Sequence, residues 1–109
     1  MAKKPMDMVE LVNQMRPNDL NDDLLYFWLS NLEYRVLYEV FEGKEGDQPI
    51  GVLQVSAPHD DIYWTYLVSM IDFATSDMEA YARSSALAEK TWRNFCKYYH
   101  RQKYKSKST

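Results

Sequence analysis

Apolar residues recur three and four positions apart through most of this chain, which is the spacing of amphipathic helices. A first helix is predicted over Pro5–Met15, because Pro17 disfavours helical geometry just beyond it. A second runs from Asp22 to about Phe41, with Asn21 as its expected N-cap and Gly43 as the left-handed residue expected to end it. The apolar stripe of the second helix comprises Leu25, Trp28 (or Leu29), Leu32, Val36 and Val40.

Two more helices are predicted in the second half of the chain. The third follows Asp60, its expected cap, and stops where Thr75 and Ser76 interrupt the pattern. Ser76 and Glu79 have the S-x-x-E spacing of a capping box, so a fourth helix is expected from Asp77 to about Arg101. The pattern therefore predicts an all-α chain, a small four-helix bundle over residues 1–109. The stripe of the fourth helix comprises Met78, Tyr81, Ser85, Ala88, Trp92, Phe95 and Tyr99.

The segment Gly43–Pro58 differs in kind, because all three glycines and two of the four prolines of the chain lie within it. Its stretch Ile50–Val55 contains β-branched residues and has two interpretations. It is an irregular loop whose apolar side chains cover the core, or it is a protruding loop or short β-hairpin, between the second and third helices, that pairs with a neighbouring subunit. On the second interpretation the subunit-interface candidates are Ile50, Val52, Leu53 and Val55.

The composition is that of one small globular domain. With 109 residues, 46% of them apolar, the chain can bury a single core, and aromatic residues reach 15%. The longest uncharged run, Ile62–Ile71, is far shorter than the roughly 20 residues of a membrane-spanning helix. No apolar stretch of a secretory signal follows Lys3 and Lys4, so we expect the chain in the cytosol, or in an assembly built there, without membrane contact.

The charges are distributed unevenly. Pro5–Glu89 contains sixteen acidic and four basic residues, whereas Lys90–Thr109 contains seven basic residues and no acidic one. Cations at the end of a last helix complement its dipole, which is one explanation. The other is a basic arm that docks on an acidic partner or on nucleic acid, with residues 102–109 as a mobile tail. The contact candidates in this arm are Lys97, Arg101, Lys103, Lys105 and Lys107.

Residues suited to catalysis or metal binding are few. Cys96 is the only cysteine and lies beside Phe95 in the apolar stripe, where a thiol is usually a small buried hydrophobe. His59 and His100 lack the spacing of a metal-ligand pair. No glycine-rich phosphate loop or nucleophile motif is present in the sequence. We therefore expect no enzyme activity, no cofactor and no metal.

Several features are shared with one group of phage proteins. The stretch Leu53–Arg101 has a proline before an aspartate-rich helix start, an acidic restart and an aromatic helix end. Before it come a short helix, a Pro-Asn turn and a helix with the letters WLS. In these features most of the chain resembles head-completion or head-tail connector proteins of long-tailed bacteriophages and prophages, which often carry Gly or Asn where this chain has Thr75 and Ser76. The residues that carry the resemblance are Pro58, Asp60, Ile62, Tyr63, Tyr66, Leu67, Met70, Ile71, Asp72, Glu79, Tyr81, Trp92, Phe95, Tyr98, Tyr99 and Arg101.

The resemblance implies a small helical, structural virion protein. It implies a homo-oligomeric ring beneath the portal protein, typically of twelve copies, that links the head to the tail through a stopper or tail-completion protein. The basic arm then becomes a candidate for contact with the portal or with genomic DNA, which passes through the channel without sequence-specific recognition. The expected location is the head-tail interface of the virion, and the host cytoplasm during assembly.

The sequence is also compatible with two other hypotheses about function. One is a cytosolic helical protein-interaction or regulatory module without a virion role. The other is a small nucleic-acid binder, because Tyr98, Tyr99 and Tyr104 alternate with cations and can stack on bases. The strongly acidic body disfavours sequence-specific binding to a DNA duplex.

Overall fold

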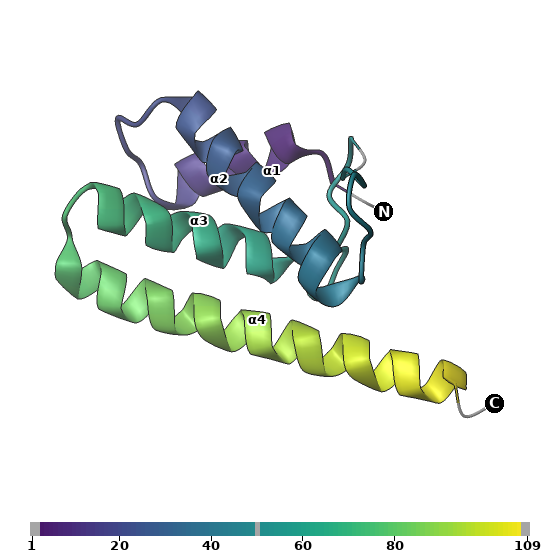
Figure 1. Ribbon diagram of the computed structural model, residues 1–109. Coiled ribbons are helices and arrows are strands. Elements are labelled where there is room, and N and C mark those ends of the chain that lie inside the picture. The colour runs from purple at the N-terminus through teal and green to yellow at the C-terminus, as the bar shows by residue number, and fades with distance from the viewer. Residues whose placement is uncertain (1–2, 50, 108–109) are drawn as a thin grey trace.

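The computed structural model describes residues 3–49 and 51–107, with side chains through Gln102. No β-strand is present among these residues, so the all-α prediction is confirmed, and the arrangement is compatible with a small helical bundle. The elements, in chain order, are α1 (Pro5–Met15), α2 (Asp22–Arg35), the π-helix η1 (Val36–Val40), α3 (Asp61–Ala74) and α4 (Met78–Lys107) (Figure 1).

Helix α3 lies at the centre of the molecule. Helices α1 and α2 pack on one side of it, and α4 runs antiparallel along its other side (Figure 1). Burying one large apolar side chain stabilises a fold by about 1.5–3 kcal/mol, so the buried apolar residues of α3 contribute substantially to the stability of the core. The buried residues of α3 are Ile62, Tyr63, Thr65, Leu67, Val68, Ser69, Ile71 and Asp72.

The first two helices follow their sequence signals closely. Helix α1 has the predicted bounds, and the Asp7 carboxylate accepts a hydrogen bond from the Lys4 backbone N–H at 3.3 Å. Helix α2 begins at Asp22, where the Asn21 side chain accepts a hydrogen bond from the Asp23 N–H at 2.9 Å, which confirms the predicted cap. The predicted stripe is buried throughout: Leu25, Trp28, Leu29, Leu32, Val36 and Val40.

The second helix ends in a π-helical turn, in which the Phe41 N–H donates to the Val36 carbonyl at 3.0 Å. The left-handed residue that follows is Glu42, with φ 57°, so the prediction that Gly43 takes this role is wrong. A Cβ atom on Gly43 would lie 2.9 Å from Leu37 Cγ, and the Gly43 N–H donates to the Leu37 carbonyl at 2.8 Å. Glycine is required here by close approach to Leu37.

A tight left-handed corner joins α3 to α4. Ser76 has φ 60°, and the Asp77 N–H donates to the Asp72 carbonyl at 3.0 Å, a bond of the Schellman motif. Asp77 then caps α4, because its carboxylate accepts a hydrogen bond from the Ala80 N–H at 3.1 Å. The predicted capping box at Ser76 is therefore wrong: this residue ends α3, and the next residue caps α4, which begins at Met78.

Asp60 precedes α3 as predicted, but its side chain does not cap the helix. The backbone of Asp60 is already helical, with φ −69° and ψ −5°. Its carboxylate lies 3.4 Å from the Lys3 ammonium nitrogen. The carboxylate thus ties the N-terminal segment to the start of α3, and the predicted side-chain cap is wrong.

The face of α4 that meets α3 is smaller and more polar than the predicted stripe. Ala80, Ser84 and Thr91 are buried. Of the predicted stripe, Phe95 is buried and Met78 is exposed. The Thr91 hydroxyl lies 2.9 Å from the Thr65 hydroxyl of α3, within hydrogen-bond distance. Small side chains let two helices approach closely, which fits the close packing of α4 on α3 at these positions.

Candidate docking surface at the end of the last helix

Helix α4 is much longer than the helix it packs on. At 1.5 Å per residue its 30 residues span about 45 Å, and the 14 residues of α3 about 21 Å. The C-terminal end of α4 therefore projects beyond the rest of the molecule (Figure 1). The residues assigned from the sequence to a basic tail continue this helix as far as Lys107, and residues 108–109 lie outside the described part.

A cationic stripe follows the C-terminal half of α4. Lys90, Arg93, Lys97 and Arg101 are spaced three, four and four residues apart, so they share one helix face, and all four are exposed. Among the described side chains, none of the four takes part in an ion pair. Cations gathered on one face are complementary to an acidic surface. Three further candidates have side chains outside the described residues: Lys103, Lys105 and Lys107.

An aromatic cluster holds α4 where it leaves the body. The centroid of the His59 ring lies 4.4 Å from that of Tyr98, and the Phe41 ring lies 5.0 Å from that of Tyr99. With Phe95 these side chains line a shallow pocket of about 180 Å³. Aromatic pairs contribute about 0.5–1.5 kcal/mol each beyond their buried area. Packing against the loop and the end of η1 therefore sets the direction of the projecting end.

A further contact fastens α4 to α2. The Arg35 guanidinium lies 4.2 Å from the centroid of the Trp92 ring, a cation–π arrangement. Its Nε atom also lies 3.0 Å from the Glu39 carboxylate. Because α4 is held by α2 and by α3, it is presented as a rod of fixed direction.

Two of the subunit-interface candidates belong to the core of the chain itself. Leu53 is 1% exposed and Val55 is 6% exposed. The Leu53 N–H donates to the Lys3 carbonyl at 2.8 Å, and the Val55 N–H donates to the Tyr63 hydroxyl at 2.9 Å. No described residue of this segment forms a strand, so it is an irregular loop that covers the core, and Leu53 and Val55 are not available to a neighbouring subunit. The other two candidates are Val52, which is half-buried, and Ile50, which lies outside the described residues.

A buried carboxyl group that was not predicted from the sequence anchors this loop. The Glu33 carboxylate accepts hydrogen bonds from the Tyr63 hydroxyl at 2.5 Å and from the Gln54 N–H at 3.0 Å. Burial raises the pKa of Glu33, although both bonds act in the opposite direction, and burial also raises the pKa of Tyr63. The signal was present in the sequence: Glu33 falls on the apolar stripe, four residues after Leu29 and three before Val36.

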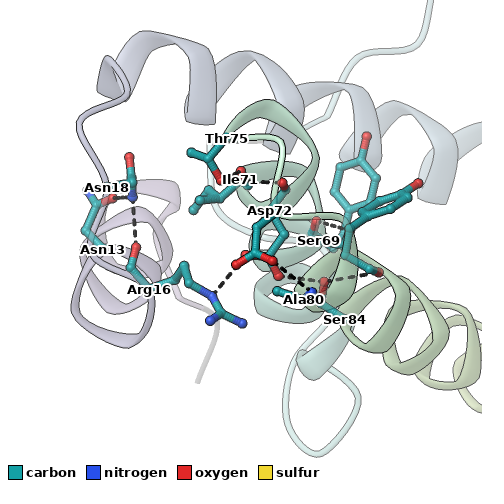
Figure 2. A network of polar contacts seen from close by, with 12 residues as sticks. Asn13, Arg16, Asn18, Ser69, Ile71, Asp72, Thr75, Ala80 and Ser84 are labelled. Carbon is teal, nitrogen blue, oxygen red and sulfur yellow. Dashed lines mark hydrogen bonds and ion pairs between the residues drawn. The ribbon is translucent and has the colours of Figure 1, made fainter.

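A second buried carboxylate joins three parts of the fold (Figure 2). Asp72 Oδ1 of α3 lies 3.2 Å from Arg16 Nε, just beyond α1, and Asp72 Oδ2 accepts a hydrogen bond from the Ser84 hydroxyl of α4 at 2.8 Å. The Asn18 side chain donates to the Arg16 carbonyl at 2.9 Å. A buried charge requires such partners, so this network orients α1 and α4 relative to α3. Sequence patterns missed it because the three side chains are distant in the chain.

The residues considered for chemistry do not converge on one site. Cys96 is half-buried, and burial raises the pKa of its thiol. His59 packs against Tyr98, whereas His100 is exposed on the projecting end of α4. Among the described residues, no three His, Cys, Asp or Glu side chains are grouped as metal ligands.

Comparisons with protein-family models, with curated proteins and with solved structures found no match to this chain. In the described part of the chain, no helix combines the length and the apolar character needed to cross a bilayer. The function proposed below therefore depends on the cationic end of α4, on the sequence features of the chain, and on the surface of the body, which is formed by α1, α2, η1, α3 and the loop between η1 and α3.

Proposed function

We propose that this chain is a structural, non-enzymatic virion protein, a connector that links the DNA-filled head of a bacteriophage to its tail as part of a ring beneath the portal. The sequence features over Leu53–Arg101 that resemble connector proteins supply this hypothesis. The structural observation that carries it is the projecting cationic end of α4, which extends away from an acidic body (Figure 1).

The acidic body suits a channel wall. All sixteen acidic residues precede Lys90, and most of them are exposed. Such a surface repels the phosphate backbone, so a duplex can pass along it without being bound. A protein that had to retain DNA would need the opposite charge on this surface.

The cationic end of α4 suits attachment within the connector. An exposed ion pair contributes only about 0.2–1 kcal/mol, so attachment through charge requires several pairs at once. The stripe from Lys90 to Arg101 supplies four exposed cations, and the sequence adds three lysines by Lys107. An acidic surface of the portal or of another connector chain is the complementary partner.

Exposed apolar side chains support assembly with other chains. Phe27 is 59% exposed, Phe73 55% and Met78 52%. Phe73 also contacts the Tyr81 ring at 5.3 Å between centroids, and both Phe73 and Met78 lie near the corner between α3 and α4. Aromatic residues and methionine are enriched in protein interfaces, where this area is removed from water.

Recruitment to portal-containing particles tests the proposal. Three tagged forms are compared: the wild-type chain, a chain lacking residues 103–109, and the Arg83→Glu variant, which changes an exposed cation in the first half of α4. We expect the wild-type chain and Arg83→Glu to sediment with the particles and the shortened chain to be lost from them. Electron microscopy of the wild-type sample is expected to show a ring below the portal.

Absence of the wild-type chain from the particles would overturn the connector proposal. A stable monomer or dimer without affinity for portal would instead indicate a helical interaction module. Affinity for a DNA duplex that falls steeply with salt would indicate a nucleic-acid binder.

A further inference from the structure

A groove between α1 and α2 has the opposite charge to the end of α4. Its volume is about 440 Å³. Glu10 and Asp22 place two exposed carboxylates on it, and Met6, which is 59% exposed, supplies an apolar wall. Asp19 and Asp23 add two exposed carboxylates beside it in the sequence. The complete lining is Met6, Val9, Glu10, Asn13, Gln14, Asp22 and Tyr26.

The end of α4 cannot reach the groove of its own chain. Helices α1 and α2 lie on one side of α3, and α4 lies on the other side and points away from them (Figure 1). Helix α4 is continuous from Met78 to Lys107, so its end would have to unfold to turn back. Each copy therefore carries two complementary surfaces that only different copies can bring together.

We propose that the end of α4 docks in the α1–α2 groove of a second copy of this chain. In this contact Lys97 and Arg101 face Glu10 and Asp22. Tyr98, which stays 44% exposed beside His59, covers Met6, a favourable sulfur–aromatic pairing. This inference rests on the proposed function, because it names the acidic surface that the cationic end binds within the connector.

The contact uses two different surfaces, so it is heterologous. Each copy donates one helix end and offers one groove, and thus binds two neighbours in the same sense around an axis. Such contacts produce a closed ring when the rotation between copies divides a full turn, and an open filament when it does not. Each copy has one α4 end and one α1–α2 groove, so every groove in an assembly can bind the α4 end of a neighbouring copy. This favours a second copy over the portal as the partner that the groove binds.

Charge reversal tests the contact with the full-length chain. Sedimentation at increasing concentration and low salt measures self-association of the wild-type chain. We expect the double variant Lys97→Glu/Arg101→Glu to weaken self-association by about tenfold or more, because like charges then face each other across the contact. We expect the same of the variant Glu10→Lys. Matched controls are Arg83→Glu and Glu45→Lys, exposed charges outside both surfaces, which are expected to associate as the wild type does.

Mixing the two reversed variants provides the decisive measurement. Lys97→Glu/Arg101→Glu and Glu10→Lys are expected to associate with each other more strongly than either variant associates with itself, because opposite charges are again paired. Carbodiimide cross-linking of the wild-type chain, with half the molecules isotopically labelled, is expected to join Lys97 to Glu10 or Asp22 between copies. Circular dichroism and thermal unfolding verify that every variant is folded.

The outcomes separate this inference from the connector proposal. The inference is overturned if neither charge-reversal variant weakens self-association. It is also overturned if the wild-type chain stays monomeric at low salt. If Lys97→Glu/Arg101→Glu self-associates normally but is lost from portal-containing particles, the end of α4 binds a surface of the portal. The contact between copies is then overturned and the connector proposal stands. If the wild-type chain self-associates through these charges but is absent from particles, the connector proposal fails and the contact between copies stands.

Discussion

Arg16 Nε lies 3.2 Å from Asp72 Oδ1, a contact that joins the segment after α1 to the end of α3. The Asp72 side chain is 3% exposed and the Arg16 side chain 43%, so the carboxylate is the desolvated partner. The Ser84 hydroxyl holds its second oxygen. Arg16 supplies the counterion of this buried carboxylate, so loss of Arg16 leaves the charge of Asp72 uncompensated.

Arg16→Ala tests this dependence. Removing one member of a fully buried ion pair costs about 3–5 kcal/mol; because Arg16 is 43% exposed and the Ser84 bond remains, the expected loss is smaller, about 1.5–2 kcal/mol. Glu39→Ala is the control, because it breaks the exposed pair with Arg35 and is expected to cost about 0.5 kcal/mol or less. The free energy of unfolding in urea measures both. Equal losses in the two variants would contradict a structural role for the Arg16–Asp72 contact.

The buried carboxyl of Glu33 predicts a pH dependence of stability. Its pKa is raised in the folded chain, so the folded state holds this proton more tightly than the unfolded chain, whose glutamate titrates near 4.5. The stability that protonation contributes is present at low pH and is lost as the pH rises through the raised pKa. The free energy of unfolding of the wild type is therefore expected to fall relative to Glu33→Gln as the pH rises from about 4.5.

Urea unfolding between about pH 4 and pH 8 measures this difference, and the other carboxyl groups cancel because both proteins contain them. Tyr63→Phe is expected to enlarge the effect, because the lost hydroxyl bond favours the ionised form of Glu33. Parallel pH profiles for the wild type and Glu33→Gln would show that Glu33 titrates alike in the folded and unfolded chains.

Ser76→Gly is expected to stabilise the protein by about 0.5 kcal/mol. Ser76 has φ 60°, where a Cβ atom costs about 1–2 kcal/mol, and the greater freedom of glycine in the unfolded chain offsets part of the gain. Ser85→Gly, within α4, is the matched control and is expected to destabilise by about 0.5 kcal/mol. Thermal unfolding of both variants measures the difference in sign; a loss of stability in Ser76→Gly would refute the left-handed corner.

Gly43→Ala is expected to destabilise the protein by about 1–2 kcal/mol, because the new methyl group would lie 2.9 Å from Leu37 Cγ and 3.1 Å from the Leu37 carbonyl oxygen. Gly51→Ala makes the same chemical change where no atom lies within 4 Å of the added carbon, and we expect little change there. Chemical unfolding compares the two. Equal stability of both variants would place Gly43 away from Leu37.

Local signals predicted the first two helices well. Pro17 acts on its immediate neighbours, and the Asn21 side chain caps a helix that begins one residue later, so both effects are readable from adjacent letters. The capping box predicted at Ser76 was wrong because the S-x-x-E motif is compatible both with the start of one helix and with the end of the preceding one. Only the position of α3, which supplies the Asp72 carbonyl, selects between them.

The candidate docking surface was likewise predictable from the sequence only in part. The cationic face of the last helix was predictable from two properties of the sequence. No acidic residue follows Glu89, and the basic residues Lys90, Arg93, Lys97 and Arg101 have helical spacing. The sequence could not show that this face extends beyond the body, because that depends on the length of α3 beside it. The acidic groove was likewise hidden, since it is formed by two helices that meet only in the fold.

By itself, the order of residues determined that this chain is helical, where its first two helices begin, and that its charges separate along its length, because these properties depend on neighbours within one or two helical turns. The tertiary structure alone decided that Leu53 and Val55 complete the core of their own chain, and that Asp72 meets Arg16. Contacts of this kind join residues far apart in the chain, and desolvation gives them their energy only after the helices have packed.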